Sequence, residues 1–238
     1  MERSEMRISG IGKSQGGYYS HVRVDGMAKI KGDTDCISLD SNGTLTVEGA
    51  LQSESVVVNG TVTVEGGVNA NRMVLDGMAT IKEQAVCNEL VTVNGRLSIG
   101  KGLIGEKVEV FGSLKTRDGV QCEVLNVHGG FNIDGLLNAG SVDIRMSFPC
   151  KTQEIGGETI TVRRFKKFNV IEQFVPALSA RLQANIIEGD EVDLEYTEAD
   201  IVRGNNVRIG KGCKIGRVEY KNQLHRDDDA AIGASHQI

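Results

Sequence analysis

Several residue types are scarce in this sequence, and each scarcity excludes a class of protein. There is no Trp, there are only two Pro, and 4% of the 238 residues are aromatic. Collagen-like and proline-rich disordered chains need Pro together with Gly, so both classes are excluded. Few side chains remain that could stack on sugars or bases.

Basic charge and long apolar runs are missing as well. The formal net charge is −5 at pH 7, which argues against a nucleic-acid binder, since such proteins gain affinity by neutralising phosphates. No apolar stretch reaches about 18 residues, the length that indicates a membrane-spanning helix. Residues 1–7 lack the apolar segment of a secretory signal. We expect a cytoplasmic protein that neither inserts into a membrane directly nor binds nucleic acid.

Glycine and β-branched residues, in contrast, are plentiful. The chain has 30 Gly, and its 26 Val and 19 Ile outnumber its 15 Leu. β-branched side chains fit the pleated surface of a strand better than the turns of a helix. The composition therefore predicts an all-β fold.

A short motif recurs through the first 145 residues. Its clearest copy is Val56-Val57-Val58-Asn59-Gly60, and the glycines of the copies stand at 26, 43, 60, 77, 95, 112 and 129. The step is 17 residues, except for one step of 18. After each glycine the apolar residues alternate, which places them on one face of a short strand. A unit of this length is one coil of a parallel β-solenoid, so we predict a main β-helix over 21–145.

Two columns of this repeat support stacked coils. The residue before the glycine is usually Asn or Asp, as at Asp25, Asn42 and Asn59. Both types tolerate the left-handed backbone region, and stacked Asn side chains can form an amide ladder. Ten positions after the glycine stands a small residue, which indicates a narrow interior. This second column reads Cys36, Ser53, Ala70, Cys87, Gly105, Cys122 and Ala139.

The small-residue column also explains the cysteines. Cys36, Cys87 and Cys122 lie two or three repeats apart, and with coils stacked at about 4.8 Å this places the thiols about 10 Å or more apart. A distance of that size is too long for a disulfide, and no CxxC or Cys/His pair suggests zinc. We interpret the cysteines as small buried thiols in a reducing compartment.

The repeat breaks over residues 146–181, which contain both prolines. We predict a β-hairpin insertion here, with strands at 151–155 and 158–162. The intervening Gly156-Gly157 is suited to a type I′ turn.

A second β-helix segment is predicted over 182–220. Residues 185–194 align with 200–209 at an offset of 15 residues, with apolar residues at matching positions. Two flanking segments lack this pattern. We expect 1–20 to be a flexible glycine-rich entry and 221–238 to be a polar tail.

The sequence offers little for catalysis. Gly12-Lys13-Ser14 resembles part of a phosphate-binding loop, but Arg7 stands where that motif needs a glycine. Residues 209–216 resemble the hexapeptide signature of left-handed-helix acyltransferases, although the pattern is isolated. We predict no catalytic, cofactor-binding or metal-binding residues and no cofactor.

One basic cluster could meet a partner. Arg163, Arg164, Lys166 and Lys167 are interleaved with phenylalanines. Such a pattern suits an anionic partner or a membrane surface. It also suits the solvated end of the predicted hairpin, which is the simpler interpretation.

Taken together, these features resemble the bactofilins, a family of polymer-forming bacterial cytoskeletal proteins. The resemblance covers nearly the whole chain. It rests on the Val-x-Val-Asn-Gly coils from 22 to 144, the glycine-rich entry at 8–19 and the closing stretch at 188–210. It implies a right-handed β-helix, polymerisation without nucleotide, and scaffolding of envelope, cell-shape or motility machinery. The insertion and the second segment suggest a longer, two-part variant.

The ends of a solenoid offer a physical reason for such assembly. The first and last coils present unpaired backbone groups and apolar core positions, which are a template for another chain. We therefore predict a homopolymer or homo-oligomer with contacts through the terminal coils. The expected contact residues are Val22, Val24 and Ile30 at one end and Ile209, Ile215 and Val218 at the other.

Two other functions stay open. β-Helix folds include polysaccharide-active enzymes and acyltransferases, but an enzyme needs an acid–base constellation, and the sequence places none on adjacent coils. A non-polymerising adaptor could instead present the 146–181 hairpin to a partner. The resemblance favours a non-enzymatic scaffold that reaches the inner face of the membrane through envelope or motility proteins.

Overall fold

The computed structural model describes residues 3–165 and 180–238. Within these ranges every regular element is a β-strand, no residue is helical, and the strands pair in parallel. The result is a parallel β-solenoid, which confirms the predicted fold class. The chain divides into two compact units, Met1–Asp118 and Gly119–Ile238.

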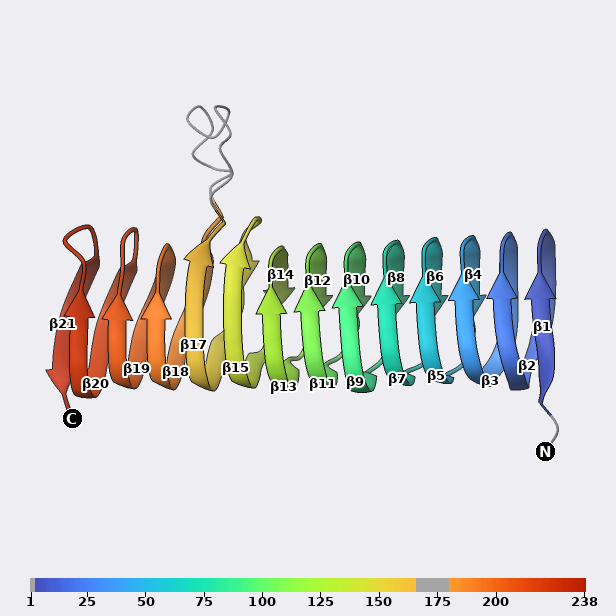
Figure 1. Cartoon of the computed structure of the whole chain (residues 1–238), viewed down its shortest axis with the longest axis horizontal. Helices are drawn as coiled ribbons and strands as arrows, with labels where there is room; N and C mark the ends of the chain where they lie inside the picture. Colours follow the sequence, from blue (N-terminus) through green and yellow to red (C-terminus); the bar gives the residue numbers. More distant parts are fainter. Residues whose placement is uncertain (1–2, 166–179) are drawn as a thin grey trace, which may run out of the picture. The chain divides into compact units, whose positions relative to one another are not determined.

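The first unit contains the strands β1 to β12, which lie side by side in Figure 1. Their bounds are β1 Ser4–Ile8, β2 Ile11–Val24, β3 Met27–Ser41, β4 Thr44–Val47, β5 Leu51–Val58, β6 Thr61–Val64, β7 Val68–Leu75, β8 Met78–Ile81, β9 Ala85–Val93, β10 Arg96–Ile99, β11 Leu103–Val110 and β12 Ser113–Thr116.

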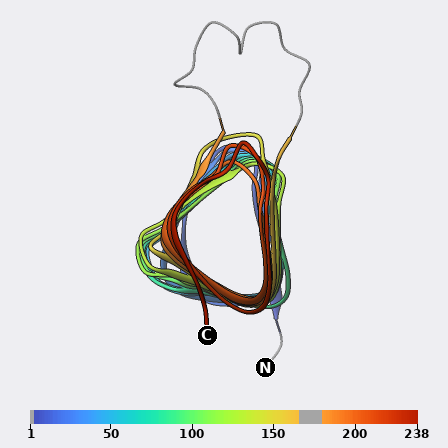
Figure 2. The ribbon, with the colours of Figure 1, turned by 90° about the vertical axis from the view of Figure 1, so that its left-hand side faces the viewer.

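Most coils of the first unit combine a four-residue strand with a longer one, as β4 and β5 do. Each strand pairs with its equivalent one coil later, so that Val58 of β5 is in register with Leu75 of β7. Along β5 the alternation of buried and exposed residues changes phase between Ser53 and Val56, which marks a corner. The coils of this unit consequently have a three-sided outline (Figure 2).

The alternating apolar positions of the first unit point into the coils, as predicted. Val62 and Val64 are 3% and 1% exposed, and Leu45 and Leu97 in the same inner column are fully buried. Burying a Val or Leu side chain contributes roughly 1.5–3 kcal/mol. The repeat therefore supplies a continuous apolar core, one coil at a time.

The single 18-residue step is absorbed by a bulge. Cys87 is in register with Ala70 and Leu90 with Arg72, so Asn88 and Glu89 occupy the space of one residue in the neighbouring coil. A bulge inserts one residue without shifting the pairing on either side. The extra residue therefore leaves both the small-residue column and the core column intact.

The repeated glycines are required by close approach between coils. A Cβ built at Gly60 would collide with the carbonyl oxygen of Gly43, and one at Gly43 with that of Gly26. The preceding Asn and Asp residues do not adopt the expected left-handed conformation, since Tyr196 is the one non-glycine residue with positive φ among those described. At this corner the backbones stack directly, and any side chain would separate them.

The second unit contains the strands β13 to β21, drawn from green to red in Figure 1. Their bounds are β13 Val120–Val127, β14 Gly130–Ile133, β15 Leu136–Met146, β16 Cys150–Lys151, β17 Glu154–Arg164, β18 Leu182–Leu194, β19 Thr197–Ile209, β20 Lys214–Arg226 and β21 Ala231–Gln237.

Coil length in the second unit varies. Val142 pairs with Ile160 at a step of 18 residues, whereas Ile187 of β18 pairs with Val202 of β19 at a step of 15. The predicted alignment of 185–194 with 200–209 is therefore the register of the structure.

The predicted hairpin at 151–155 and 158–162 is wrong. Residues Glu154–Arg164 form one strand, β17, which pairs in parallel with β15 and with β18. Gly157 is not in a turn: a Cβ there would collide with the carbonyl oxygen of Ala139, so the glycine serves close stacking. The coil from Ile155 to Ile187 is 32 residues long and includes 166–179, which lie outside the described residues.

Both flanking segments also differ from expectation. In 1–20, expected to be flexible, β1 and most of β2 pair in parallel with the coil that follows. In 221–238, expected to be a tail, β20 extends to Arg226 and β21 pairs with it. Polar residues hid these strands, because the hydrogen bonds that hold them come from the backbone and leave little trace in an apolar pattern.

Candidate functional site

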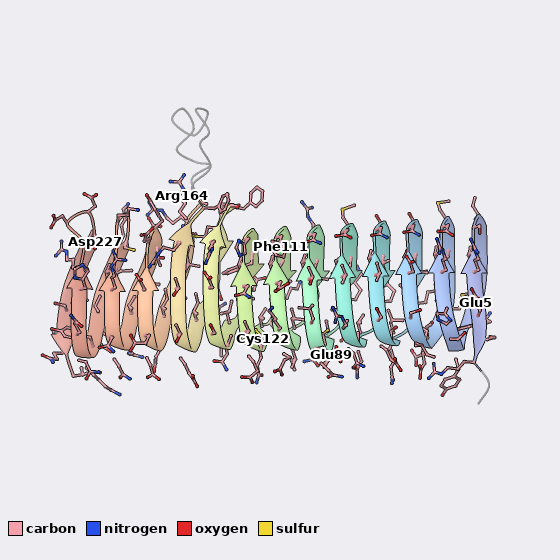
Figure 3. All side chains as sticks on the ribbon, in the orientation of Figure 1. Glu5, Glu89, Phe111, Cys122, Arg164 and Asp227 are labelled. Carbon is pink, nitrogen blue, oxygen red and sulfur yellow. The ribbon has the colours of Figure 1, made fainter. Side chains whose placement is uncertain are left out.

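The five cysteines are buried free thiols, as the small-residue column predicted for three of them. Burial raises the pKa of Cys122 (Figure 3) and of Cys150 to about 12. A thiol with so high a pKa is a poor nucleophile and metal ligand, since both roles need the thiolate. Among the described residues, no three His, Cys, Asp or Glu side chains gather as a metal site would require.

One corner of the first unit carries the predicted amide ladder. The side-chain Nδ2 of Asn42 donates to Asp25 Oδ1 at 2.9 Å, and that of Asn59 donates to Asn42 Oδ1 at 2.7 Å. Further along, Asn94 donates to Asp76 at 2.6 Å. Each bond joins one coil to the next, so the ladder fixes the register of the stack.

In the second unit, ion pairs connect side chains of successive coils. Arg163 pairs with Asp193, which also lies 3.5 Å from Arg208, and Arg208 is 3.2 Å from Asp227. Charges of alternating sign thus follow one another across successive coils. Isolated exposed pairs contribute little, but a connected network at fixed geometry can contribute more.

A parallel column has the same construction. Arg203 of β19 lies 3.4 Å from Glu188 of β18 and 2.6 Å from Glu219 of β20. The hydrogen bond from Arg203 lowers the pKa of Glu219. These pairs were not predicted, although the alignment of 185–194 with 200–209 sets Glu188 against Arg203 and Asp193 against Arg208.

The predicted basic cluster is divided by the structure. Arg163 is held by Asp193, and the Cζ atom of Arg164 lies 5.3 Å from the ring centroid of Tyr196 (Figure 3). Both arginines therefore have partners within the second unit. Lys166 and Lys167 lie outside the described residues.

The six predicted contact residues are buried. Val22, Val24, Ile30, Ile209, Ile215 and Val218 are each at most 3% exposed. They were placed in the terminal coils because the flanking segments were expected to lack strands. In fact β1 covers β2 at one side, and β21 pairs with β20 at the other. This placement is corrected: the outermost described edges are formed by β1 together with Ile11–Tyr18 of β2, and by β21 together with the end of β20.

The outermost strands leave backbone groups available. In the described part of the chain β1 pairs with β2 alone, and β21 pairs with β20 alone. The Ile8 carbonyl accepts from the Asp25 N–H at 2.9 Å, and the Ile238 N–H donates to the Tyr220 carbonyl at 2.9 Å. Since successive residues of a strand face opposite sides, the N–H and C=O of Arg7 face the open edge of β1.

None of the described residues form a helix with the length and apolarity that a membrane crossing requires.

The described residues form a parallel β-solenoid in which β1 and β21 each pair with one strand. Over 99 residues the chain is 43% identical to "Uncharacterized protein YhbF" of Bacillus subtilis (strain 168), and over 107 residues it is 36% identical to "Uncharacterized protein YhbE" of the same organism. These matches cover 41% and 44% of this chain, and 40% and 44% of the two relatives. The chain thus matches less than half the length of either relative. No family model and no solved structure matches it.

Proposed function

We propose that this protein is a non-enzymatic scaffold of the bactofilin type, which assembles with copies of itself by stacking coil on coil. The observation that carries the proposal is the open edge of β1 and of β21. A strand with one partner presents a row of unpaired donors and acceptors, which another strand can complete. Assembly of this kind needs no nucleotide, because the bonds that form are those already present between coils.

Inner side chains of the outermost coils support the same proposal. Met6 on β1 is 7% exposed, and Ile8 is half-buried, whereas Val22 and Val24 one coil inward are fully buried. A further coil stacked on β1 would cover the remaining apolar surface, which contributes about 25 cal/mol per Å². In this proposal the assembled protein supports envelope, cell-shape or motility machinery and reaches the inner face of the membrane through those partners.

Proline substitutions at the open edges test the proposal. The N–H of Arg7 faces away from β2, and the N–H of Gln237 faces away from β20. Arg7→Pro and Gln237→Pro should therefore remove a donor from each edge at little cost to the coil itself. Arg7→Ala and Gln237→Ala keep the backbone donor and are the matched controls.

The readout is sedimentation velocity, with circular dichroism to confirm the fold. We expect the wild type and both alanine variants to sediment as large assemblies and the double proline variant to sediment as a small particle. If the double proline variant is folded and still forms large assemblies, stacking through these edges is wrong.

A further inference from the structure

A groove on the first unit is lined by polar side chains, several of which have no hydrogen-bond partner among the described residues. It crosses β2, β3, β5 and β7, and its polar side chains include Tyr18, Asp35, Gln52, Asn69 and Gln84. At the middle of the groove the turn positions are the small residues Ala50 and Gly67, which leave room between the larger Asp33 and Gln84 of the flanking coils.

Four of these side chains form a straight column. Tyr18 is in register with Asp35, Asp35 with Gln52, and Gln52 with Asn69. Successive members are about 4.8 Å apart at the backbone, which is the spacing of paired strands. The column therefore offers an aromatic ring followed by evenly spaced hydrogen-bonding groups.

The amides of the groove differ from the other Asn side chains of the first unit. Asn42, Asn59 and Asn94 bond to the neighbouring coil, and Asn88 donates to Asn71 at 3.0 Å. In the described first unit Gln52, Asn69 and Gln84 have no such partner. Where the amides elsewhere hold coils together, these three face solvent with both a donor and an acceptor available.

Tyr18 is an exposed ring in a chain with few aromatics. It is 56% exposed, and the sequence has four Tyr and no Trp. The Cζ atom of Arg3 lies 5.9 Å from the ring centroid, and Arg3 is itself held by Asp35 at 2.8 Å. The ring is thus fixed from one side while the groove side stays open to a ligand.

The lining selects the class of ligand. It contains Asp33 and Asp35 but neither Lys nor Arg, so it disfavours phosphates and other anions. A peptide could add to the groove as a strand only along Ile11–Tyr18 of β2, where β1 does not pair. The exposed ring and the neutral amides of the lining instead favour a neutral, extended ligand with many hydroxyl groups and flat apolar faces.

We propose that this groove binds a neutral, extended β-linked polysaccharide, with one sugar ring stacked on Tyr18 and the next ones hydrogen-bonded by Gln52 and Asn69. The amide groups can donate to and accept from sugar hydroxyls, and the even spacing of the column suits a polymer of repeating units. This inference does not rest on the proposed scaffold function.

The test is saturation-transfer NMR on the full chain with short chitin oligosaccharides and, separately, short cellulose oligosaccharides. These two probes differ in the acetamido group and therefore distinguish two sources of the same chemistry. We expect binding to at least one of them. Tyr18→Ala should weaken it about tenfold, as loss of a stacked aromatic ring does, whereas Tyr18→Phe should retain it. Gln52→Ala and Asn69→Ala should each weaken it several-fold.

Gln15→Ala and Met78→Ala are the matched controls, since both residues are exposed on the first unit outside the groove and should not change binding. The proposal is overturned if neither probe binds, if Tyr18→Ala binds as the wild type does, or if a heparin oligosaccharide binds in their place. Sedimentation of the same samples reports on self-assembly separately.

Discussion

The two units build the same kind of coil but differ in how the side-chain contacts between coils are balanced. In the first unit, coils of nearly constant length are joined by amide bonds such as that from Asn59 to Asn42, beside ion pairs such as Lys29 with Glu48. In the second, coils of varying length also have an amide bond from Asn205 to Asp190, but they carry connected charges, as where Arg208 lies between Asp193 and Asp227. Long, flexible charged side chains can reach a partner across coils of unequal length, whereas the short Asn side chain needs its partner at the matching position of the next coil.

The core should be equally intolerant of charge in both units. Val58 of the first unit and Val202 of the second are 1% and 0% exposed. Val58→Asp and Val202→Asp each bury a carboxylate without a partner, and we expect each to destabilise the protein by more than about 4 kcal/mol. Hydrogen exchange read by mass spectrometry resolves the two units in the full chain. Protection that survives in the mutated unit would contradict a closed core.

Glycine-to-alanine substitutions should destabilise the protein more where the backbones of neighbouring coils are in close contact than where they are further apart. Gly60→Ala in the first unit forces a methyl group against the carbonyl oxygen of Gly43 and should cost about 1–3 kcal/mol. At Gly140 in the second unit the nearest backbone atom would lie 3.2 Å from the new Cβ, so Gly140→Ala should cost about 0.5 kcal/mol or less. Melting temperatures of the two variants show which substitution destabilises the protein more. Equal losses of stability would mean that the repeated glycine is not required by close approach between coils.

The register-setting side chains should respond differently to salt. Asn59→Ala removes a neutral bond and should cost about 1 kcal/mol at any ionic strength. Arg163→Gln removes a half-buried ion pair and should cost about 1 kcal/mol at low salt and less at high salt. Urea denaturation across a salt series makes the comparison. If both costs fall together with salt, the two ladders do not differ in kind.

Acid should weaken the charged ladder. Arg203 lowers the pKa of Glu219 below its usual 4.5, so the folded state binds a proton less readily than the unfolded one. The stabilisation from this pair is fully present above the unfolded-state pKa of 4.5 and is lost as the pH falls through the lowered pKa of the folded state. Arg203→Gln should therefore reduce the difference in melting temperature between neutral and acidic pH. An unchanged difference would show that this pair does not contribute.

Much of the fold could be predicted because the positions of apolar residues define the repeat. The 17-residue step placed Val62 and Val64 in the core, and the 15-residue offset gave the register of β18 with β19. The pattern failed where backbone pairing continues without apolar alternation. β1 and β21 contain few large apolar residues, and a glycine that allows close stacking, such as Gly157, looks the same in sequence as one in a hairpin turn.

The candidate surfaces were harder to predict for the same reason. Val24 and Ile215 were placed at the ends because the coils beyond them were not recognised, and both are buried. The groove at Tyr18 brings together residues that are 17 positions apart and differ in type from one coil to the next. A search for repeated residues does not find such a column, since its members share a position and not a side chain.

Electron microscopy of the purified protein in negative stain, without nucleotide and across a salt series, tests the central claim most directly. Stacking through strand edges predicts filaments or long rods that form without nucleotide and are absent in the folded Arg7→Pro, Gln237→Pro variant. Discrete particles at every salt concentration would leave the β-solenoid intact and would contradict self-assembly as its function.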